Sequence, residues 1–297
     1  KQLITYCSKS THTWIDKAAI LFGHGSNSIR WIPTDASNKM DNHVLEQTIK
    51  EDLKNGHQPF MVVGTAGDVS TGVVDNLKAI ATICKAYDLW FHIDGAYGVP
   101  AAIIPELKEL FAGLKEADSI ALDPHKWLYS PLEAGCTLVK NPKHLIDTYS
   151  SHPEYYNFSL TEEGGSLNYF EYGLQNSRGF RALKVWLALQ QIGSNGYKKL
   201  IREDIELSKT HYEVFIEILN TKVELNYDLV LIFSYPIAGV PFTPSPPKIQ
   251  RQYKRMYGYP TRKTARAVHG SGDFSLQYYQ VQRDTISTDF LSLIPNH

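Results

Sequence analysis

The chain has 297 residues, of which 43% are hydrophobic and 21% are charged, and its net charge is −1. These proportions are typical of a soluble globular protein. A net charge so close to zero excludes broad electrostatic attraction to nucleic acid or to a membrane surface. No apolar run approaches the roughly 20 residues that a membrane span requires, so we expect neither nucleic acid nor membrane as a partner.

The first half of the chain predicts strands that alternate with helices, each assigned from hydrophobic periodicity and from capping residues. The predicted strands are 3–7, 28–32, 59–64, 89–94, 120–122 and 136–139, and the predicted helices are 11–21, 41–54, 73–87, 106–116 and a short one after 141. Strands and helices in this alternation predict an α/β fold with a mostly parallel sheet that helices cover on both faces. Ligands of such sheets bind at the carboxyl ends of the strands.

The second half of the chain predicts fewer strands. Residues 151–167 are polar and predict a mobile loop, and two amphipathic helices are expected at 180–192 and 197–219. Four prolines within residues 241–247 indicate a break or linker. Seven basic residues and no acidic residue occur in 248–266, a pattern that favours a solvated helix over a basic arm for nucleic acid.

A lysine follows the predicted strand 120–122, in the run Asp123-Pro124-His125-Lys126-Trp127. Asp123-Pro124 ends the strand, because the residue before a proline leaves helical geometry and the proline has no N–H to donate. A lysine amine held out of bulk water between two rings is a candidate nucleophile, although a surface lysine after a turn would show the same pattern.

A carboxylate follows the strand 89–94 in the same way. Asp94 ends this strand and is followed by Gly95 and Ala96, which leave room for a flat ring to lie against the backbone. A turn aspartate or a helix cap is the alternative for Asp94 taken alone. Because Asp94 and Lys126 both follow strands, topology places them at the same edge of the sheet.

The two runs resemble a known family. Residues 92–97 (His-Ile-Asp-Gly-Ala-Tyr) and 123–127 (Asp-Pro-His-Lys-Trp) match the patterns H-x-D-A/G-A-Y and N/D-P-H-K-W in order and spacing. These patterns are those of the group II amino-acid decarboxylases, which are pyridoxal 5'-phosphate (PLP) enzymes of fold type I and include aromatic-L-amino-acid, histidine and glutamate decarboxylases. The resemblance extends from the start of the chain to about residue 186.

The resemblance implies two domains. A PLP-binding large domain of fold type I is expected at 1–190, and a connecting helix with a small α+β C-terminal domain at 191–297. In the family, the point where this chain begins lies inside the large domain, after a dimerisation segment and a loop that holds the phosphate. We therefore expect the chain to be a fragment, an incomplete sequence or a degenerate relative.

The resemblance assigns three residues to the cofactor ring. Lys126 would form a Schiff base with the pyridoxal aldehyde, and Asp94 would pair with the pyridine nitrogen, which keeps the ring an electron sink. Ala96 would contact the opposite ring face, where a larger side chain would clash. A small residue in a tight turn is the alternative explanation of Ala96.

Four further residues are cofactor candidates by the same resemblance. His12 would stack on the ring and contact the substrate carboxylate, and His125 would contact the phosphate or else only pack on Trp127. Thr65 and Ser70 are the nearest matches to a T-x-G-T-T loop, in which small residues and hydroxyls permit close approach to ring and phosphate. A plain strand-to-helix turn is the alternative for this loop.

Tyr155 is the remaining catalytic candidate, together with Lys126 and His12. In the decarboxylases, a tyrosine on this loop protonates the α-carbon after CO₂ leaves, whereas aldehyde synthases have phenylalanine there. The neighbouring Tyr156 is the alternative residue for this role. The arginines at 178 and 181 match a turn that we interpret as structural or as a dimer contact. No metal-ligand pattern is predicted.

These observations favour PLP-dependent decarboxylation of an L-amino acid to an amine and CO₂. The alternatives are another PLP reaction on this fold, such as an aldehyde synthase or lyase, and a catalytically inactive interaction module. The family implies a homodimer with a shared active site, and it leaves the substrate open, with aromatic amino acids slightly favoured. Three scattered cysteines predict free thiols and, with no visible signal peptide, a cytoplasmic protein.

Overall fold

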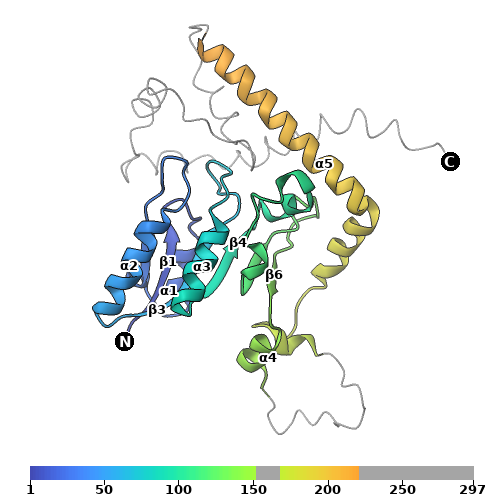
Figure 1. Ribbon diagram of the computed structural model, residues 1–297. Helices are drawn as coiled ribbons and strands as arrows, with labels where there is room; N and C mark the ends of the chain where they lie inside the picture. The colour runs from blue at the N-terminus through green and yellow to red at the C-terminus, as the bar shows by residue number, and fades with distance from the viewer. Residues whose placement is uncertain (152–167, 221–297) are drawn as a thin grey trace, which may run out of the picture. The chain divides into compact units, whose positions relative to one another are not determined.

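The computed structural model of the chain describes residues 1–151 and 168–220 (Figure 1). They all belong to one compact unit, Lys1–Pro241, and a second unit, Phe242–His297, lies outside the described residues. The strands are β1 (Leu3–Ser8), β2 (Ile29–Ile32), β3 (Gln58–Thr65), β4 (Trp90–Asp94), β5 (Ser119–Leu122) and β6 (Cys136–Val139). The α-helices are α1 (Trp14–Leu21), α2 (Asn42–Lys54), α3 (Leu77–Tyr87), α4 (Lys143–Tyr149) and α5 (Arg181–Asn220).

The six strands form one sheet in the order β2-β1-β3-β4-β5-β6. All neighbours run parallel except β5 and β6, which are antiparallel. The predicted mostly parallel α/β sheet is therefore confirmed, and the carboxyl ends of β1, β3, β4 and β5 lie along one edge. Within the described ranges, no helix has both the length and the apolar character that crossing a membrane requires.

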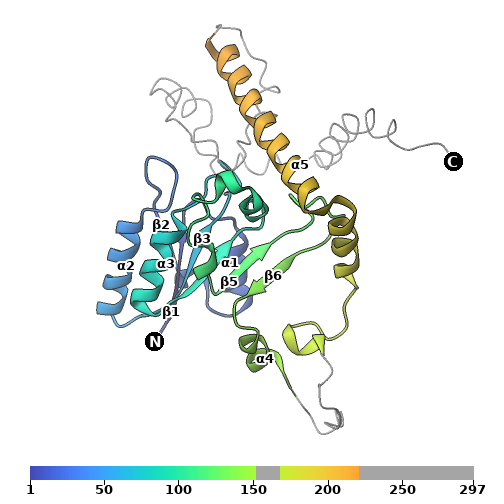
Figure 2. The same cartoon turned by 45° about the vertical axis from the view of Figure 1, so that its right-hand side comes forward.

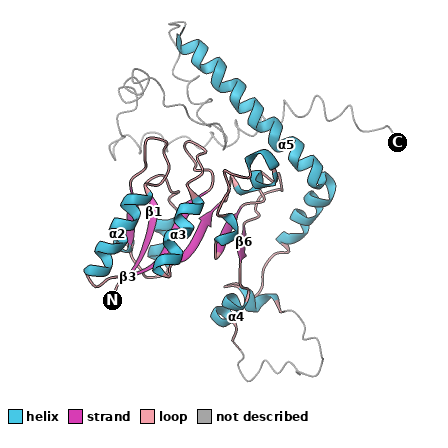
Figure 3. Ribbon diagram, viewed as in Figure 1, coloured by secondary structure: helices cyan, strands magenta, loops and turns pink. Residues whose placement is uncertain are grey.

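Helices cover both faces of the sheet: α2 and α3 lie over one face, as Figure 3 shows, and α1 packs on the other. Side chains alternate between the faces along each strand, so Ile4, Val62 and Phe91 pack with α2 and α3 in the larger core cluster. Cys7 and Val63 point to the opposite face and pack with Ile15 and Ala19 of α1, the helix that Figure 2 shows on the far side of the sheet from α2 and α3. By the same alternation, Asp94 belongs to the face that carries α1.

Two helix starts follow from capping residues. Asp41 caps α2 by accepting hydrogen bonds from two backbone N–H groups, and α2 occupies the predicted segment 41–54, where the sequence offers Asp41 or Asn42 as the cap. The predicted start of α3 at residue 73 is wrong, because Val74 forms a β-bridge with Ala66 and the helix begins only after its cap, Asn76. The helix predicted from residue 11 likewise begins later, at Trp14.

The helix predicted at 106–116 is wrong. The structure has two short 3-10 helices in this segment, Pro105–Leu107 and Leu114–Glu116, with turns between them. Gly113 has φ +100°, a left-handed conformation that interrupts a right-handed helix. Other 3-10 helices are Ser26–Ser28, Val99–Ile103 and Tyr169–Tyr172.

The two helices predicted at 180–192 and 197–219 form α5, with a break at Gly193, where φ is 67° and ψ is 166°. The predicted loop at 151–167 falls outside the described residues except for its first residue. The predicted linker at 241–247, the basic segment and the small α+β C-terminal domain fall outside them as well.

Candidate functional site

Asp94 lies at the carboxyl end of β4 and is 7% exposed. Both of its carboxylate oxygens accept a hydrogen bond: Oδ1 from the backbone N–H of Ala96 at 3.2 Å, and Oδ2 from Nε1 of Trp14 at 2.6 Å. Both donors are neutral, and Asp94 has no ion-pair partner in the described part of the chain. A buried carboxylate without a cation is costly, so the arrangement favours binding of a positively charged group beside Asp94.

His92, two residues earlier, points to the same face of the sheet as Asp94. Its Nδ1 lies 2.8 Å from Oγ of Ser119, and the ring of Trp14 meets it edge-on at a centroid distance of 5.7 Å. Burial lowers the pKa of His92, and the nearby charge of Asp94 opposes this effect. The shift favours the neutral imidazole, which leaves the charge of Asp94 uncompensated from this side.

Lys126 lies in the turn that follows β5, and its side chain is 40% exposed. Its Nζ forms an ion pair with Oδ2 of Asp123 at 2.9 Å. The turn is closed by a hydrogen bond from the backbone N–H of Lys126 to the carbonyl of Asp123. The amine is therefore held by its own turn and remains accessible to a ligand.

Backbone contacts join the ends of β4 and β5. Asp94 pairs with Ala121 in the register of the two strands, and the N–H of Asp123 donates to the carbonyl of Ala96 at 3.1 Å. The predicted residues Asp94, Ala96 and Lys126 thus belong to two adjacent, hydrogen-bonded turns at one edge of the sheet.

Thr65 lies at the end of β3 and pairs with Asp94 in the strand register. Its Oγ1 is 3.4 Å from Oγ1 of Thr11, the residue before His12. His12 itself is exposed, and its Nδ1 accepts a hydrogen bond from the backbone N–H of Trp14 at 3.3 Å. These contacts bring Thr65, and the chain segment that carries His12, to the edge that holds Asp94.

Ser70 and His125 lie in loops. Ser70 is exposed, and its backbone N–H donates to Asp68. This hydrogen bond does not connect Ser70 to Asp94, Ala96 or Lys126. His125 is half-buried; its Nδ1 lies 2.7 Å from the carbonyl of Ala134, and its Nε2 lies 3.9 Å from Asp123. Tyr155 lies outside the described residues.

The turn that carries Lys126 is also held from α5. Trp127 is 3% exposed, its ring stacks on Tyr97 at 4.9 Å, and its Nε1 donates to Asp204 at 2.7 Å. Tyr129 donates to the same oxygen of Asp204. Because Tyr97 directly follows Ala96, these contacts pack the turns after β4 and β5 against each other and against α5.

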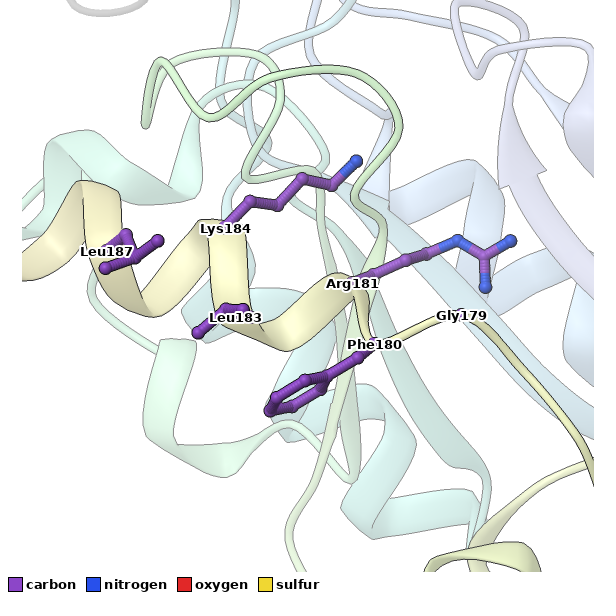
Figure 4. Close-up of a pocket in the computed structure, with 6 residues that line it drawn as sticks. All are labelled: Gly179, Phe180, Arg181, Leu183, Lys184 and Leu187. Atoms are coloured by element: carbon purple, nitrogen blue, oxygen red, sulfur yellow. The ribbon is translucent and has the colours of Figure 1, made fainter.

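A hollow of about 330 Å³ lies elsewhere, at the start of α5 (Figure 4). Its lining residues are Gly179, Phe180, Arg181, Leu183, Lys184 and Leu187, and none of them is a site candidate. The chemistry-bearing residues therefore belong to the edge of the sheet and not to this hollow.

Two contacts of the site were not predicted from the sequence. Trp14 as the partner of Asp94 lies 80 residues away in the chain, and no local pattern indicates that contact. The pairing of Asp123 with Lys126 could have been predicted from the local sequence, because a carboxylate three residues before a lysine in a turn can reach the lysine amine.

The family model described as "Pyridoxal-dependent decarboxylase conserved domain" matches residues 1–232. The chain belongs to this family. It is 38% identical over 206 residues to an aromatic-L-amino-acid decarboxylase from Bacillus atrophaeus, a match that covers 69% of this chain and 43% of the relative. It is 33% identical over 246 residues to tyrosine decarboxylase 2 from Arabidopsis thaliana, covering 80% of this chain and 44% of that protein.

Solved structures of the family have the same fold. The structure of Oryza sativa TDC with PLP and tryptamine matches with a TM-score of 0.67 at 30% identity, over 71% of this chain and 43% of that one. A Rhodiola rosea 4-hydroxyphenylacetaldehyde synthase matches with a TM-score of 0.64 at 33% identity, over 72% of this chain and 44% of that one. The sequence-based prediction of the group II decarboxylase family and of fold type I is confirmed. The chain spans less than half the length of these pyridoxal-dependent relatives.

Proposed function

We propose that the chain carries the cofactor-binding part of a PLP-dependent L-amino-acid decarboxylase, a carboxy-lyase. The observation that carries the proposal is the buried carboxylate of Asp94, held by two neutral donors with no cation partner among the described residues, one strand away from the turn that presents Lys126. The family membership and the similar solved structure that contains PLP support the same cofactor.

The donor set fits this cofactor. A pyridine ring that carries a proton on its nitrogen supplies the positive charge that Asp94 lacks, and an aldehyde on the same ring is a partner for a primary amine. Asp94 and Lys126 offer these two groups from neighbouring strand ends, and we propose that one planar molecule meets both. When bound, the cofactor supplies an electron sink for the bond that breaks at the substrate α-carbon.

The residues of this chain then have distinct proposed roles. Asp94 holds the proton on the ring nitrogen, and Ala96 leaves space beside the ring. Lys126 is the amine that would attach to the aldehyde with loss of water, and Asp123 holds that amine. His12, Thr65, Ser70 and His125 remain proposed contacts of ring, phosphate or substrate, and Tyr155 is the proposed donor of the proton to the product.

The test is covalent attachment of PLP to the purified chain. We expect visible absorbance on addition of the cofactor and, after borohydride reduction, a mass increase on the peptide that contains Lys126. Lys126→Ala should lose both signals, whereas Lys140→Ala, a change of an exposed lysine after β6, should keep them. An unmodified wild-type chain at saturating PLP would overturn the proposal and favour a non-catalytic relative.

A second reaction is a candidate because aldehyde synthases occur among the relatives, for example phenylacetaldehyde synthase of a Rosa hybrid cultivar at 33% identity. Tyr155 favours the decarboxylase, since the aldehyde synthases are expected to have phenylalanine there. Product analysis separates the two, because decarboxylation yields an amine and CO₂ while the synthase yields an aldehyde. The substrate is proposed only as an amino acid, and the relatives named for tyrosine and aromatic amino acids favour an aromatic one.

The assembly and the domains are proposals as well. We propose a cofactor-binding domain at 1–190 followed by a connecting helix and a small domain at 191–297, and the break of α5 at Gly193 supports this boundary. A homodimer is supported by the apolar residues that the first half of α5 exposes. A cytoplasmic location is supported by the three free cysteines, of which Cys7 and Cys84 are buried.

A further inference from the structure

We propose that Trp14 is a positioning residue for the cofactor: its indole N–H fixes the Asp94 carboxylate in the orientation that the ring nitrogen needs. This inference rests on the function proposed above. Trp14 is the first residue of α1, and its Nε1 donates to Oδ2 of Asp94 at 2.6 Å, across 80 residues of sequence. The bond ties α1 to the carboxyl end of β4.

The hydrogen bonds of Asp94 leave room for a third donor. A carboxylate has about four lone-pair positions, two on each oxygen, and Trp14 and Ala96 use one on each. The two bonds fix the plane of the carboxylate while one lone pair on each oxygen remains for a ring nitrogen. Because a short hydrogen bond to a charged acceptor is among the stronger ones, loss of the indole N–H should free the carboxylate to rotate.

The indole itself is held in place by packing. Trp14 is half-buried, its ring lies edge-on against His92 at 5.7 Å, and it packs against the cluster of Cys7, Ile15 and Val63 on this face of the sheet. Indole is a neutral donor with no acceptor atom, so it orients the carboxylate without neutralising its charge. A lysine or arginine in the same place would satisfy the charge and compete with the cofactor.

Trp90 provides a matched control. Its Nε1 also donates to a side-chain oxygen, Oγ of Ser119 at 2.8 Å, and Trp90 belongs to β4, the strand that Asp94 ends. Trp14→Phe and Trp90→Phe therefore make the same chemical change, loss of one indole hydrogen bond, and only the first change touches Asp94. A general loss of packing should affect both variants alike.

The experiment titrates each variant with PLP and records the affinity and the visible circular dichroism of the bound cofactor. We expect Trp14→Phe to weaken PLP binding by roughly tenfold, the ratio expected from loss of one hydrogen bond to a charged group, and to change the dichroism. Trp90→Phe should change neither by more than about twofold. Equal affinity and dichroism in the two variants would overturn the inference.

A second measurement, of the indole N–H resonances, follows PLP binding in the wild-type protein and so does not depend on the stability of a variant. The chain has five tryptophans, so labelled indole N–H groups give five resonances, and Trp14→Phe identifies that of Trp14. The strongly hydrogen-bonded Trp14 resonance should stay downfield when wild-type protein binds PLP; a move to the position of a free indole would show displacement by the cofactor and would overturn the inference. If wild-type protein never attaches PLP to Lys126, the proposed function fails, whereas attachment with an unchanged Trp14→Phe variant refutes only the role of Trp14.

Discussion

At the scale of single residues, Asp75 is a buried carboxylate that binds backbone N–H groups at the edge of the sheet. It is 4% exposed, and its two oxygens accept from the backbone N–H groups of Met40 at 2.7 Å and Thr65 at 2.8 Å. Burial raises the pKa of Asp75 to about 6, although the two N–H donors act in the opposite direction. Asp75 thus fixes the backbone of Thr65, one of the site candidates, through a group that titrates near neutral pH.

The raised pKa predicts a specific pH dependence of stability. The folded-state pKa of Asp75 lies above its ordinary value of 3.8. The contribution of Asp75 to the free energy of unfolding is therefore fully present below pH 3.8 and is lost as the pH rises through about 6. The loss is at most about 3 kcal/mol. We expect the difference in unfolding free energy between wild type and Asp75→Asn to narrow over this range, measured by urea denaturation at several pH values.

Asp41→Asn is the control for this prediction. Asp41 also accepts two backbone N–H bonds, but it caps α2 in a less buried position, where asparagine caps about as well. A constant difference between wild type and Asp75→Asn from pH 4 to pH 7 would contradict the prediction.

At the scale of secondary-structure elements, the segment between β4 and β5 shows how packing against a distant helix prevents the helix that hydrophobic periodicity predicts. Gly113 has φ +100°, and a Cβ there would lie 2.5 Å from the backbone nitrogen of Lys78, in the first turn of α3. The segment therefore packs glycine against a helix start and cannot continue as the helix predicted at 106–116. Gly113→Ala should be destabilising, because the substitution adds a clash to an unfavourable conformation.

Gly56 permits a quantitative comparison. It also has positive φ, at +77°, but a Cβ there would meet nothing within 4 Å. Gly56→Ala should cost roughly 1–2 kcal/mol from its backbone conformation alone, and Gly113→Ala a further 1–3 kcal/mol from the clash. Thermal or chemical unfolding of both variants measures the difference, and equal costs would show that α3 yields to the added methyl group.

The elements also show what a sequence can predict. Strand positions, the helix at 41–54 and the motifs around Asp94 and Lys126 depend on residues close in the chain, and the structure has these strands and this helix where they were predicted. The partner of Asp94 and the turn at Gly113 depend on packing between distant segments, and no local pattern encodes them. The roles of the site residues remain predictions, because they depend on a bound cofactor.

At the scale of the whole molecule, the two halves of α5 have different environments. Its second half is attached to the site, since Asp204 accepts from Trp127 and Tyr129, and the hydroxyl of Tyr197 donates to the carbonyl of Leu128 at 2.9 Å. Its first half instead exposes large apolar side chains. These are Leu183, Trp186, Leu187 and Leu189, with exposed fractions from 42% to 55%, and Phe180, the residue just before α5, is 75% exposed.

Such a patch is typical of a protein–protein contact, and the proposed homodimer would cover it. Leu183 lines the hollow at the start of α5 and is 44% exposed, so Leu183→Lys places a charge in the proposed interface. We expect this change to raise the dimer dissociation constant at least about tenfold, because burying an unpaired charge in an interface is unfavourable. Leu207→Lys is the matched control, since Leu207 is 57% exposed on the second half of the same helix. Sedimentation over a range of concentrations gives the constant for each form, and a dimer that tolerates Leu183→Lys as well as Leu207→Lys must use another surface.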